Sequence, residues 1–160
     1  MGVDRREFLG TAAAIGAVSL AGLSARSRAA VQFEVSHSPG DWLRLLGPER
    51  YRVLREAATE PAWSSPLLKE HRRGTFVCAG CELPLFSSTT KFESGTGWPS
   101  FYRALPNAVV TRPDYSLMEK RTEVLCRRCG GHLGHVFDDG PRITGLRYCM
   151  NGLALQFRPA

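Results

Sequence analysis

Cysteine spacing is the feature that most constrains this 160-residue sequence, because four of its five cysteines form two pairs with the same spacing. The pairs are Cys78 with Cys81 and Cys126 with Cys129, and the fifth cysteine, Cys149, stands alone. Two Cys-x-x-Cys pairs supply the four sulfur ligands of a tetrahedral zinc ion, and such a site has no position open for a substrate. The spacing therefore predicts a structural zinc ion and one free thiol.

Two other uses of the paired cysteines stay open from the residues alone. An exported chain favours disulfides, although an odd number of cysteines leaves one thiol free. A redox pair at Cys78 and Cys81 is the second use, but Leu83-Pro84 follows it where a redox motif needs the N-terminus of a helix. The 44 residues between the two pairs also exceed the common zinc-ribbon spacing. Zinc is the interpretation we favour.

Residues 1–29 read as a targeting segment, which leaves residues 30–160 as the folded domain. Asp4-Arg5-Arg6-Glu7-Phe8-Leu9 is typical of a twin-arginine signal, and Ser27-Arg28-Ala29 offers a small-x-small cleavage site. The apolar run from Phe8 to Leu23 has 16 residues, fewer than the ~20 that a spanning helix needs. We expect export to the periplasm with the fold and zinc already in place, and no stable membrane anchor after cleavage.

Length and charge narrow the class of protein further. The chain is long enough for a single ordinary core. Its formal net charge is +6, and four arginines of the leader, against Asp4 and Glu7, account for two of these charges, which leaves +4. Four thiolates on a zinc dication would lower the charge by a further two, and binding to nucleic acid through bulk charge requires a clustered basic face. We therefore expect no nucleic-acid partner.

The apolar pattern predicts a mainly β domain with one or two short N-terminal helices. Gly47-Pro48-Glu49 is a good helix start, and Thr59-Glu60-Pro61 is expected to end that helix. Short β-like runs follow, divided by Gly, Pro, Asn and Asp. These runs are Thr75–Val77, Ala108–Thr111, Arg121–Leu125, Leu146–Met150 and Leu153–Phe157, the last with Leu153, Leu155 and Phe157 on one face.

The strand around Cys149 places chemistry on one of its faces. Residues two apart share a face of a strand, so Arg147, Cys149 and Asn151 point one way, while Tyr148 and Met150 point the other. A guanidinium favours the thiolate, which is the nucleophilic form of cysteine. The alternative is that Cys149 is a small buried hydrophobic residue.

Two histidines and a loop tryptophan are further candidates for a site. His132 and His135 lie in the segment before Cys149, and an imidazole beside a thiolate is suited to proton transfer. Either histidine alone could instead be structural. Trp98 lies on a Gly/Pro-rich loop, where it either caps the core or grips a methyl or thioether group.

Taken together, these residues resemble the type B methionine sulfoxide reductases, which reduce methionine-R-sulfoxide in proteins. The resemblance runs from about Tyr51 to Phe157. Its motifs occur in the family's order: Thr59-Glu60, Cys78-x-x-Cys81 with Pro84-Leu85-Phe86, Gly95-Thr96-Gly97-Trp98-Pro99-Ser100-Phe101, Arg121-Thr122-Glu123-Val124, Cys126-x-x-Cys129, His132-Leu133-Gly134-His135-Val136-Phe137 with Asp139-Gly140-Pro141, and Gly145-Leu146-Arg147-Tyr148-Cys149-x-Asn151.

The resemblance implies a fold of two antiparallel sheets with flanking helices and a zinc ion held by the two cysteine pairs. It implies that Cys149 is the nucleophile and forms a sulfenic acid. It further implies that His135 donates the proton, that His132 and Asn151 orient it, and that Arg147 stabilises the thiolate. Trp98, with Phe137 nearby, would pack on the substrate's S-methyl group. The substrates would be oxidised proteins under oxidative stress, with blocked or free methionine sulfoxide reduced less well.

Two departures from the family bear on these expectations. Many relatives keep a second, resolving cysteine, but here every cysteine except Cys149 belongs to the predicted zinc set. Regeneration would then use a thioredoxin-like protein or a small thiol directly. In addition, Met118-Glu119 replaces the family's usual Gly-Met near the substrate entrance. Two rival functions are a zinc-ribbon interaction module and a cysteine hydrolase that uses Cys149 with His135.

Overall fold

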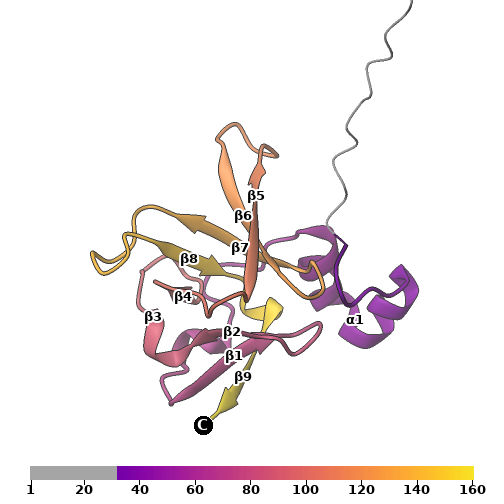
Figure 1. Ribbon diagram of the computed structural model, residues 1–160, viewed down its shortest axis with the longest axis horizontal. Coiled ribbons are helices and arrows are strands. Elements are labelled where there is room, and N and C mark those ends of the chain that lie inside the picture. The colour runs from indigo at the N-terminus through magenta and orange to yellow at the C-terminus, as the bar shows by residue number, and fades with distance from the viewer. Residues whose placement is uncertain (1–31) are drawn as a thin grey trace, which may run out of the picture. The chain divides into compact units, whose positions relative to one another are not determined.

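The computed structural model describes residues 32–160, so the predicted signal segment at residues 1–29 lies outside the described residues. Over this range the chain forms two β-sheets with one α-helix and three short 3-10 helices (Figure 1). The helical elements are α1 (Pro39–Glu56), η1 (Pro66–Lys69), η2 (Ser88–Thr90) and η3 (Gly152–Ala154). The strands are β1 (Gly74–Cys78), β2 (Pro84–Ser87), β3 (Lys91–Phe92), β4 (Ser100–Phe101), β5 (Val109–Asp114), β6 (Arg121–Cys126), β7 (His132–Phe137), β8 (Arg147–Met150) and β9 (Leu155–Pro159). Among the described residues, no helix is both long and apolar enough to cross a membrane.

Both sheets are antiparallel, which confirms the predicted mainly β fold. The smaller sheet has the order β2-β1-β9, and the larger has the order β3-β4-β8-β7-β6-β5. In the larger sheet, β7 and β8 pair so that His135 lies opposite Cys149 and Phe137 lies opposite Arg147. Gly134 permits this pairing, because a Cβ at that position would lie 2.1 Å from the carbonyl oxygen of Cys149.

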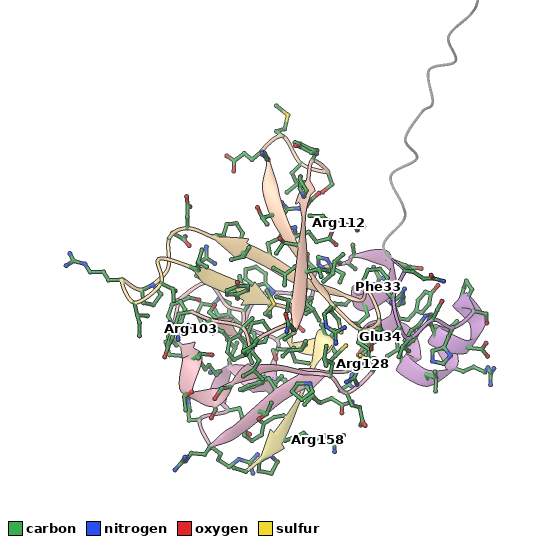
Figure 2. All side chains as sticks on the ribbon, viewed as in Figure 1. Phe33, Glu34, Arg103, Arg112, Arg128 and Arg158 are labelled. Carbon is green, nitrogen blue, oxygen red and sulfur yellow. The ribbon has the colours of Figure 1, made fainter. Side chains whose placement is uncertain are left out.

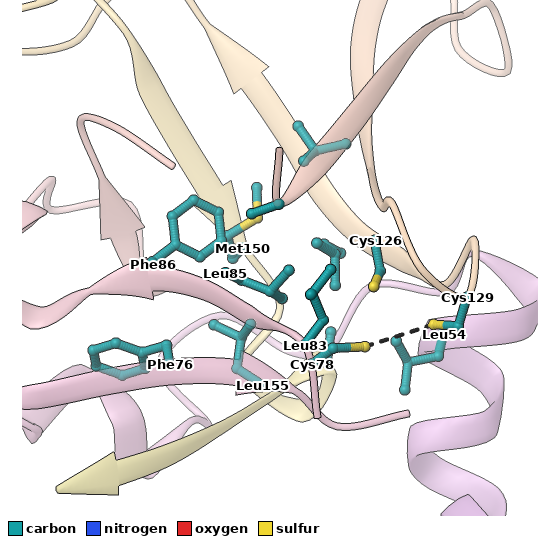
Figure 3. Close-up of a cluster of buried hydrophobic side chains, with 14 of the residues drawn as sticks. Leu54, Phe76, Cys78, Leu83, Leu85, Phe86, Cys126, Cys129, Met150 and Leu155 are labelled. Carbon is teal, nitrogen blue, oxygen red and sulfur yellow. Dashed lines mark hydrogen bonds between the residues drawn. The ribbon is translucent and has the colours of Figure 1, made fainter. Parts of the chain in front are cut away.

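Aromatic side chains fill the core between the two sheets. Phe86 on β2 stacks on Phe101 of β4 with ring centroids 4.4 Å apart, and Phe76 on β1 meets the same ring at 4.9 Å. All three side chains are fully buried. Figure 3 shows Phe76, Phe86 and Met150 within this cluster of buried side chains. Burying an aromatic ring of this kind contributes about 1.5–3 kcal/mol, so this contact holds the sheets together.

Strand β8 alternates between the core and a more open face, as the sequence predicts. Met150 is fully buried, and the Tyr148 ring lies 5.7 Å from that of Phe86. Arg147 and Cys149 are only partly buried, and Cys149 lines a pocket. The core side of the strand therefore fixes the position of the thiol on its other side.

Helix α1 consists of two segments that meet at Gly47, where φ is 70° and ψ is 166°. The second segment begins at Pro48, as predicted. The first segment was not predicted, although its start carries a good signal: the Ser38 hydroxyl accepts a hydrogen bond of 3.2 Å from the Asp41 amide. The predicted end at residues 59–61 is too late, because Ala57 already adopts the left-handed conformation that terminates the helix.

The chain before α1 is anchored to the turn between β6 and β7. The Val35 amide donates to the carbonyl of Arg128 at 3.0 Å. Glu34 forms ion pairs with Arg127 and Arg128, and the side chains of Glu34 and Arg128 are marked in Figure 2. These contacts join the N-terminal segment to the turn that carries Cys129.

The strand predictions were incomplete in two ways. Strands β2, β3, β4 and β7 were not predicted, and β3 and β4 are only two residues long. The prediction that Leu153 shares a strand face with Leu155 and Phe157 was wrong. Leu153 lies in η3, and β9 begins at Leu155. The η3 turn lies where the chain passes from β8 of the larger sheet to β9 of the smaller one.

Candidate functional site

The two cysteine pairs come together in space, as predicted from their spacing. Their four sulfur atoms all lie within 4.8 Å of one another. The Cys78 and Cys129 sulfurs are 3.7 Å apart, and those of Cys81 and Cys126 are 3.5 Å apart. Ligands at the usual zinc–sulfur length in a tetrahedron are about 3.8 Å apart. The geometry fits one zinc ion whose coordination is completed by sulfur, so its role is structural.

This metal site joins the two sheets. Cys78 ends β1 of the smaller sheet, while Cys126 ends β6 of the larger one. Helix α1 covers the site, since Arg55 donates to the carbonyl of Cys129 at 2.9 Å and Leu54 lies beside Cys129 (Figure 3). Cys81 is partly exposed, while the other three cysteines are buried.

A separate pocket of about 130 Å³ contains Cys149. Its lining combines a thiol, an imidazole, an amide and aromatic rings, and consists of Thr59, Trp98, Arg121, Gly134, His135, Phe137, Cys149 and Asn151. A larger cavity of about 620 Å³ lies beside α1 and β9, but no thiol or imidazole lines it. The smaller pocket is therefore the candidate reaction site.

His135 is held by an acid that the sequence analysis did not identify. Its Nε2 lies 2.8 Å from Asp114 Oδ2, and Arg121 Nη2 donates to the same oxygen at 2.7 Å. The pKa of Asp114 is well below its usual range, chiefly because the Ser116 amide donates to the carboxylate, with further bonds from Ser116, His135 and Arg121. An ionised Asp114 requires a proton on His135 Nε2. The other ring nitrogen is then the one that can transfer a proton.

His132 lies beside His135 but does not line the pocket. The two rings are 5.5 Å apart in an edge-on arrangement. His132 is buried, which lowers its pKa, and its Nδ1 lies 2.7 Å from Glu123 Oε1. Burial opposes ionisation of Glu123, but bonds from Arg112 and His132 outweigh it and lower the pKa of that carboxyl. This arrangement gives neutral His132 with its proton on Nδ1.

Trp98 and Asn151 are linked through the backbone of Glu60. The Trp98 indole donates to the Glu60 carbonyl at 3.1 Å, and the Glu60 amide donates to Asn151 Oδ1 at 3.0 Å. The buried Glu60 carboxylate accepts bonds from the amides of Gly152 and Leu153, at 2.5 and 2.9 Å. The Glu60 backbone thus holds two of the pocket-lining side chains, Trp98 and Asn151, in place.

Arg147 divides its charge between Cys149 and an acid. Its guanidinium makes two bonds of 2.8 Å to Asp139 and lies over the Phe137 ring at 4.4 Å. The pKa of Arg147 is raised mainly by Asp139, and Cys149 acts in the same direction. The sequence predicted Arg147 next to the thiol but not its ion pair.

The structure brings together five of the residues predicted for the site: Cys149, His135, Asn151, Trp98 and Phe137. His132 and Arg147 lie just outside the lining. The exposed pair Met118-Glu119 lies in the turn between β5 and β6, which stands clear of the other strands in Figure 1. Sequence reasoning missed Arg121 and Thr59 as pocket residues, although motifs quoted above contained both, and it missed Asp114, which bonds His135 from outside the pocket lining.

Comparisons with known proteins agree on one family. A protein-family model described as SelR domain matches residues 46–159. A "Peptide methionine sulfoxide reductase MsrB" of Leptospira interrogans is 54% identical over 129 residues, which cover 80% of this chain and 98% of the relative. Proteins of the same name from Thiobacillus denitrificans and Bradyrhizobium diazoefficiens are 55% and 53% identical, over 74% and 79% of this chain and 90% and 91% of theirs.

Proposed function

The chain belongs to the SelR domain family, and we propose how its own residues perform the family's reaction. The protein is an oxidoreductase that reduces methionine-R-sulfoxide to methionine and is regenerated by a thiol. It holds one structural zinc ion at Cys78, Cys81, Cys126 and Cys129. The observation that carries the residue assignment is that Cys149 shares a small pocket with His135, Trp98 and Asn151.

Cys149 is the nucleophile in this proposal. Its thiolate attacks the sulfoxide, takes the oxygen and forms a sulfenic acid, while the sulfoxide sulfur is reduced to the thioether of methionine. One proton must be supplied, because the bare oxygen is a very poor leaving group. Cys149 is oxidised by two electrons in this step and methionine sulfoxide is reduced by two.

His135 supplies that proton. Ionised Asp114 holds the Nε2 proton of the ring, so protonated His135 has its second proton available on Nδ1. Neutral His132 packs against the His135 ring and orients it.

The remaining pocket residues bind and orient the substrate. Trp98 presents a polarisable face for the S-methyl group, and its indole N–H is already engaged by Glu60, so the ring position is fixed. Phe137 extends the apolar side of the pocket. Asn151 helps to orient the transferred proton, and Arg147 favours the thiolate of Cys149.

Regeneration proceeds by direct attack of an external thiol on the sulfenic acid. The other four cysteines belong to the metal cluster, so none is available as a resolving thiol. A first thiol forms a mixed disulfide with Cys149 and releases water, and a second thiol restores the Cys149 thiol and leaves with the first as a disulfide. A thioredoxin-like protein or a small thiol is the reductant that we propose, and oxidised proteins are the substrates.

We also propose export to the periplasm by the twin-arginine route, with residues 30–160 as the mature enzyme. The support is the Arg5-Arg6 pair and the short apolar run after it. Replacing both arginines with lysine should retain the full-length chain in the cytoplasm, while a matched Arg26→Lys change should leave export intact. Fractionation of the cells checks this, and equal export of both variants would refute the assignment.

The reaction is tested by incubating residues 30–160 with racemic blocked methionine sulfoxide and dithiothreitol. The two epimers are then resolved by chiral chromatography. We expect loss of the R epimer alone. If neither epimer declined in a zinc-replete, reduced sample, the interaction-module alternative would replace the enzyme.

A further inference from the structure

A chain of three hydroxyl groups ends at the Cys149 sulfur. The Thr96 hydroxyl lies 3.7 Å from Cys149 Sγ, within hydrogen-bond range for sulfur. Thr96 Oγ1 is 2.8 Å from Ser94 Oγ, which is 2.7 Å from Ser100 Oγ. Ser100 Oγ donates to the carbonyl of Trp98 at 3.1 Å, and Ser100 is 1% exposed. The chain thus runs from the thiol into the interior.

When Cys149 is a thiol, the number of available protons fixes which group donates in each of these hydrogen bonds. Each hydroxyl has a single proton to donate. If Ser100 donates to the Trp98 carbonyl, Ser94 must donate to Ser100, and Thr96 must donate to Ser94. Thr96 then has no proton left for the sulfur and accepts one from the Cys149 S–H. All four links are satisfied only in this order.

The order reverses when Cys149 is a thiolate. The sulfur now has no proton, so Thr96 must donate to it, Ser94 must donate to Thr96, and Ser100 must donate to Ser94. The link from Ser100 to Trp98 is given up. No heavy atom needs to move, because each hydroxyl proton only rotates about its C–O bond.

We propose that Thr96 is a positioning residue that stabilises the Cys149 thiolate through this reversible hydroxyl chain, an inference that rests on the proposed role of Cys149. A hydrogen bond to an ionised acceptor is roughly twice as strong as one between neutral groups. The gain at the sulfur therefore outweighs loss of the neutral Ser100–Trp98 bond. Thr96 makes the thiolate available without becoming a second nucleophile.

Charged groups around the sulfur act in addition to this chain. Arg147 on β8 favours the thiolate, but Asp139 shares its charge. His135 on β7 lies opposite Cys149 on β8 and is bonded to Asp114, and Arg121 of β6 also lines the pocket. Each of these three side chains is bonded to an acid, whereas the Thr96 hydroxyl has no charge to be neutralised. The Thr96 hydroxyl therefore adds a stabilisation of the Cys149 thiolate that the neighbouring ion pairs do not weaken.

The test measures the alkylation rate of Cys149 by iodoacetamide against pH in zinc-replete protein, with mass spectrometry to count a single label. Thr96→Val removes the hydroxyl and preserves the shape of the side chain. We expect the rate at pH 7 to fall about five- to tenfold, the effect of losing one hydrogen bond to an anion, with the pH profile displaced upward. Thr96→Ser should restore the wild-type profile.

Thr89→Val is the matched control, because Thr89 also bonds a serine hydroxyl, that of Ser87, at 2.8 Å. The Thr89 hydroxyl bonds Ser87, whereas the Thr96 hydroxyl reaches Cys149, so the Thr89 variant should alkylate like the wild type. An unchanged profile in Thr96→Val, or an equal displacement in Thr96→Ser, would overturn the proposal. Alkylation needs no sulfoxide, so this result is independent of whether the wild type shows reductase turnover.

Ser94→Ala tests the reversal itself. Without Ser94, Thr96 can donate to the sulfur while Ser100 keeps its bond to Trp98, so forming the thiolate no longer costs a link. The profile should stay in place or move to lower pH, opposite to Thr96→Val. A displacement to higher pH as large as that of Thr96→Val would show that the chain does not switch and that both changes merely disturb the loop.

Discussion

Strand β6 carries a metal-binding cysteine at one end and lines the Cys149 pocket at the other. Arg121 and Cys126 are five residues apart, which is about 17 Å along an extended strand. At the Cys126 end, four cysteine sulfurs lie within 4.8 Å of one another, and helix α1 covers them. At the Arg121 end, the Cys149 sulfur faces a hydroxyl, an imidazole and a guanidinium.

The difference teaches that surroundings, and not residue type, decide what a thiol does in this fold. A sulfur within a closed set of four ligands has no free position for an incoming atom. A sulfur at a pocket wall, with a proton source opposite, can attack a substrate as a thiolate, and its oxidised form can in turn be attacked by an incoming thiol. The same residue therefore stabilises the fold at one site and carries chemistry at the other.

Replacing Cys149 with serine should produce the largest effect. A serine hydroxyl does not ionise near neutral pH without a base, so turnover should fall by at least about 1,000-fold. Steady-state reduction of R-sulfoxide measures this. Zinc content and thermal unfolding should match the wild type, and an active variant would refute the nucleophile assignment.

Replacing His135 with asparagine removes the proton donor and keeps a polar side chain. Loss of a general acid costs typically 100-fold or more, so we expect a fall of about that size in the rate of methionine formation. Single-turnover experiments isolate this step from regeneration. Turnover within threefold of the wild type would assign the proton to another group.

Replacing Cys126 with serine should change zinc content and stability, the two properties that Cys149→Ser leaves intact. Loss of a ligand should release zinc and lower the free energy of unfolding by more than about 3 kcal/mol. Zinc release with a chromogenic chelator and thermal unfolding provide the measurements. Retention of one zinc ion per chain with unchanged stability would contradict the four-cysteine site.

Replacing Glu60 with glutamine should alter the pH dependence of stability. Burial raises the pKa of Glu60, although the amides of Gly152 and Leu153 favour its ionised form. The folded state therefore binds this proton at higher pH than the unfolded chain does. This carboxyl contributes its full stability below its unfolded value of about 4.5 and loses it as pH rises through the folded pKa.

Unfolding of both proteins in denaturant at pH 7 and pH 5 tests the sign. The wild type should gain stability relative to Glu60→Gln as the pH falls. The variant should also show a higher KM, because the glutamine NH2 group cannot accept a hydrogen bond from Gly152 or Leu153, and losing one of these bonds disturbs the backbone next to Asn151. A stability difference that is constant over this pH range would mean that Glu60 does not titrate there.

Replacing Met118 with alanine should have the smallest effect. Its side chain is fully exposed at the turn between β5 and β6, so stability should change by less than about 0.5 kcal/mol. Thermal unfolding and the KM for blocked methionine sulfoxide check this. A large rise in KM for a protein substrate alone would place the turn in substrate docking.

Local patterns predicted the fold class and the metal ligands, because both depend on short-range features. Cysteine spacing identified the zinc set, and period-two alternation placed Cys149 and Met150 on opposite faces. The missed strand β7 has a glycine, Gly134, in its middle. A glycine in a sequence is typical of a turn, but here the close pairing of β7 with β8 requires one. The strands β3 and β4 are too short to have a period.

The acids of the site could not be predicted in this way, because their roles depend on strand register. Asp114 meets His135 only because β5 pairs with β6 and β6 pairs with β7. Glu60 reaches Asn151 from 91 residues away in sequence. Such contacts belong to tertiary structure, where sequence spacing gives no distance.

The exposure of Met118 makes the enzyme itself a target of oxidants. Cys78, Cys126, Cys129 and Met150 are buried, and Cys81 and Cys149 are partly covered, so Met118 offers the most accessible sulfur of the described residues. Methionine at a solvent-facing turn is readily converted to its sulfoxide. A damaged copy of this enzyme would then present its own repair substrate to an intact neighbour.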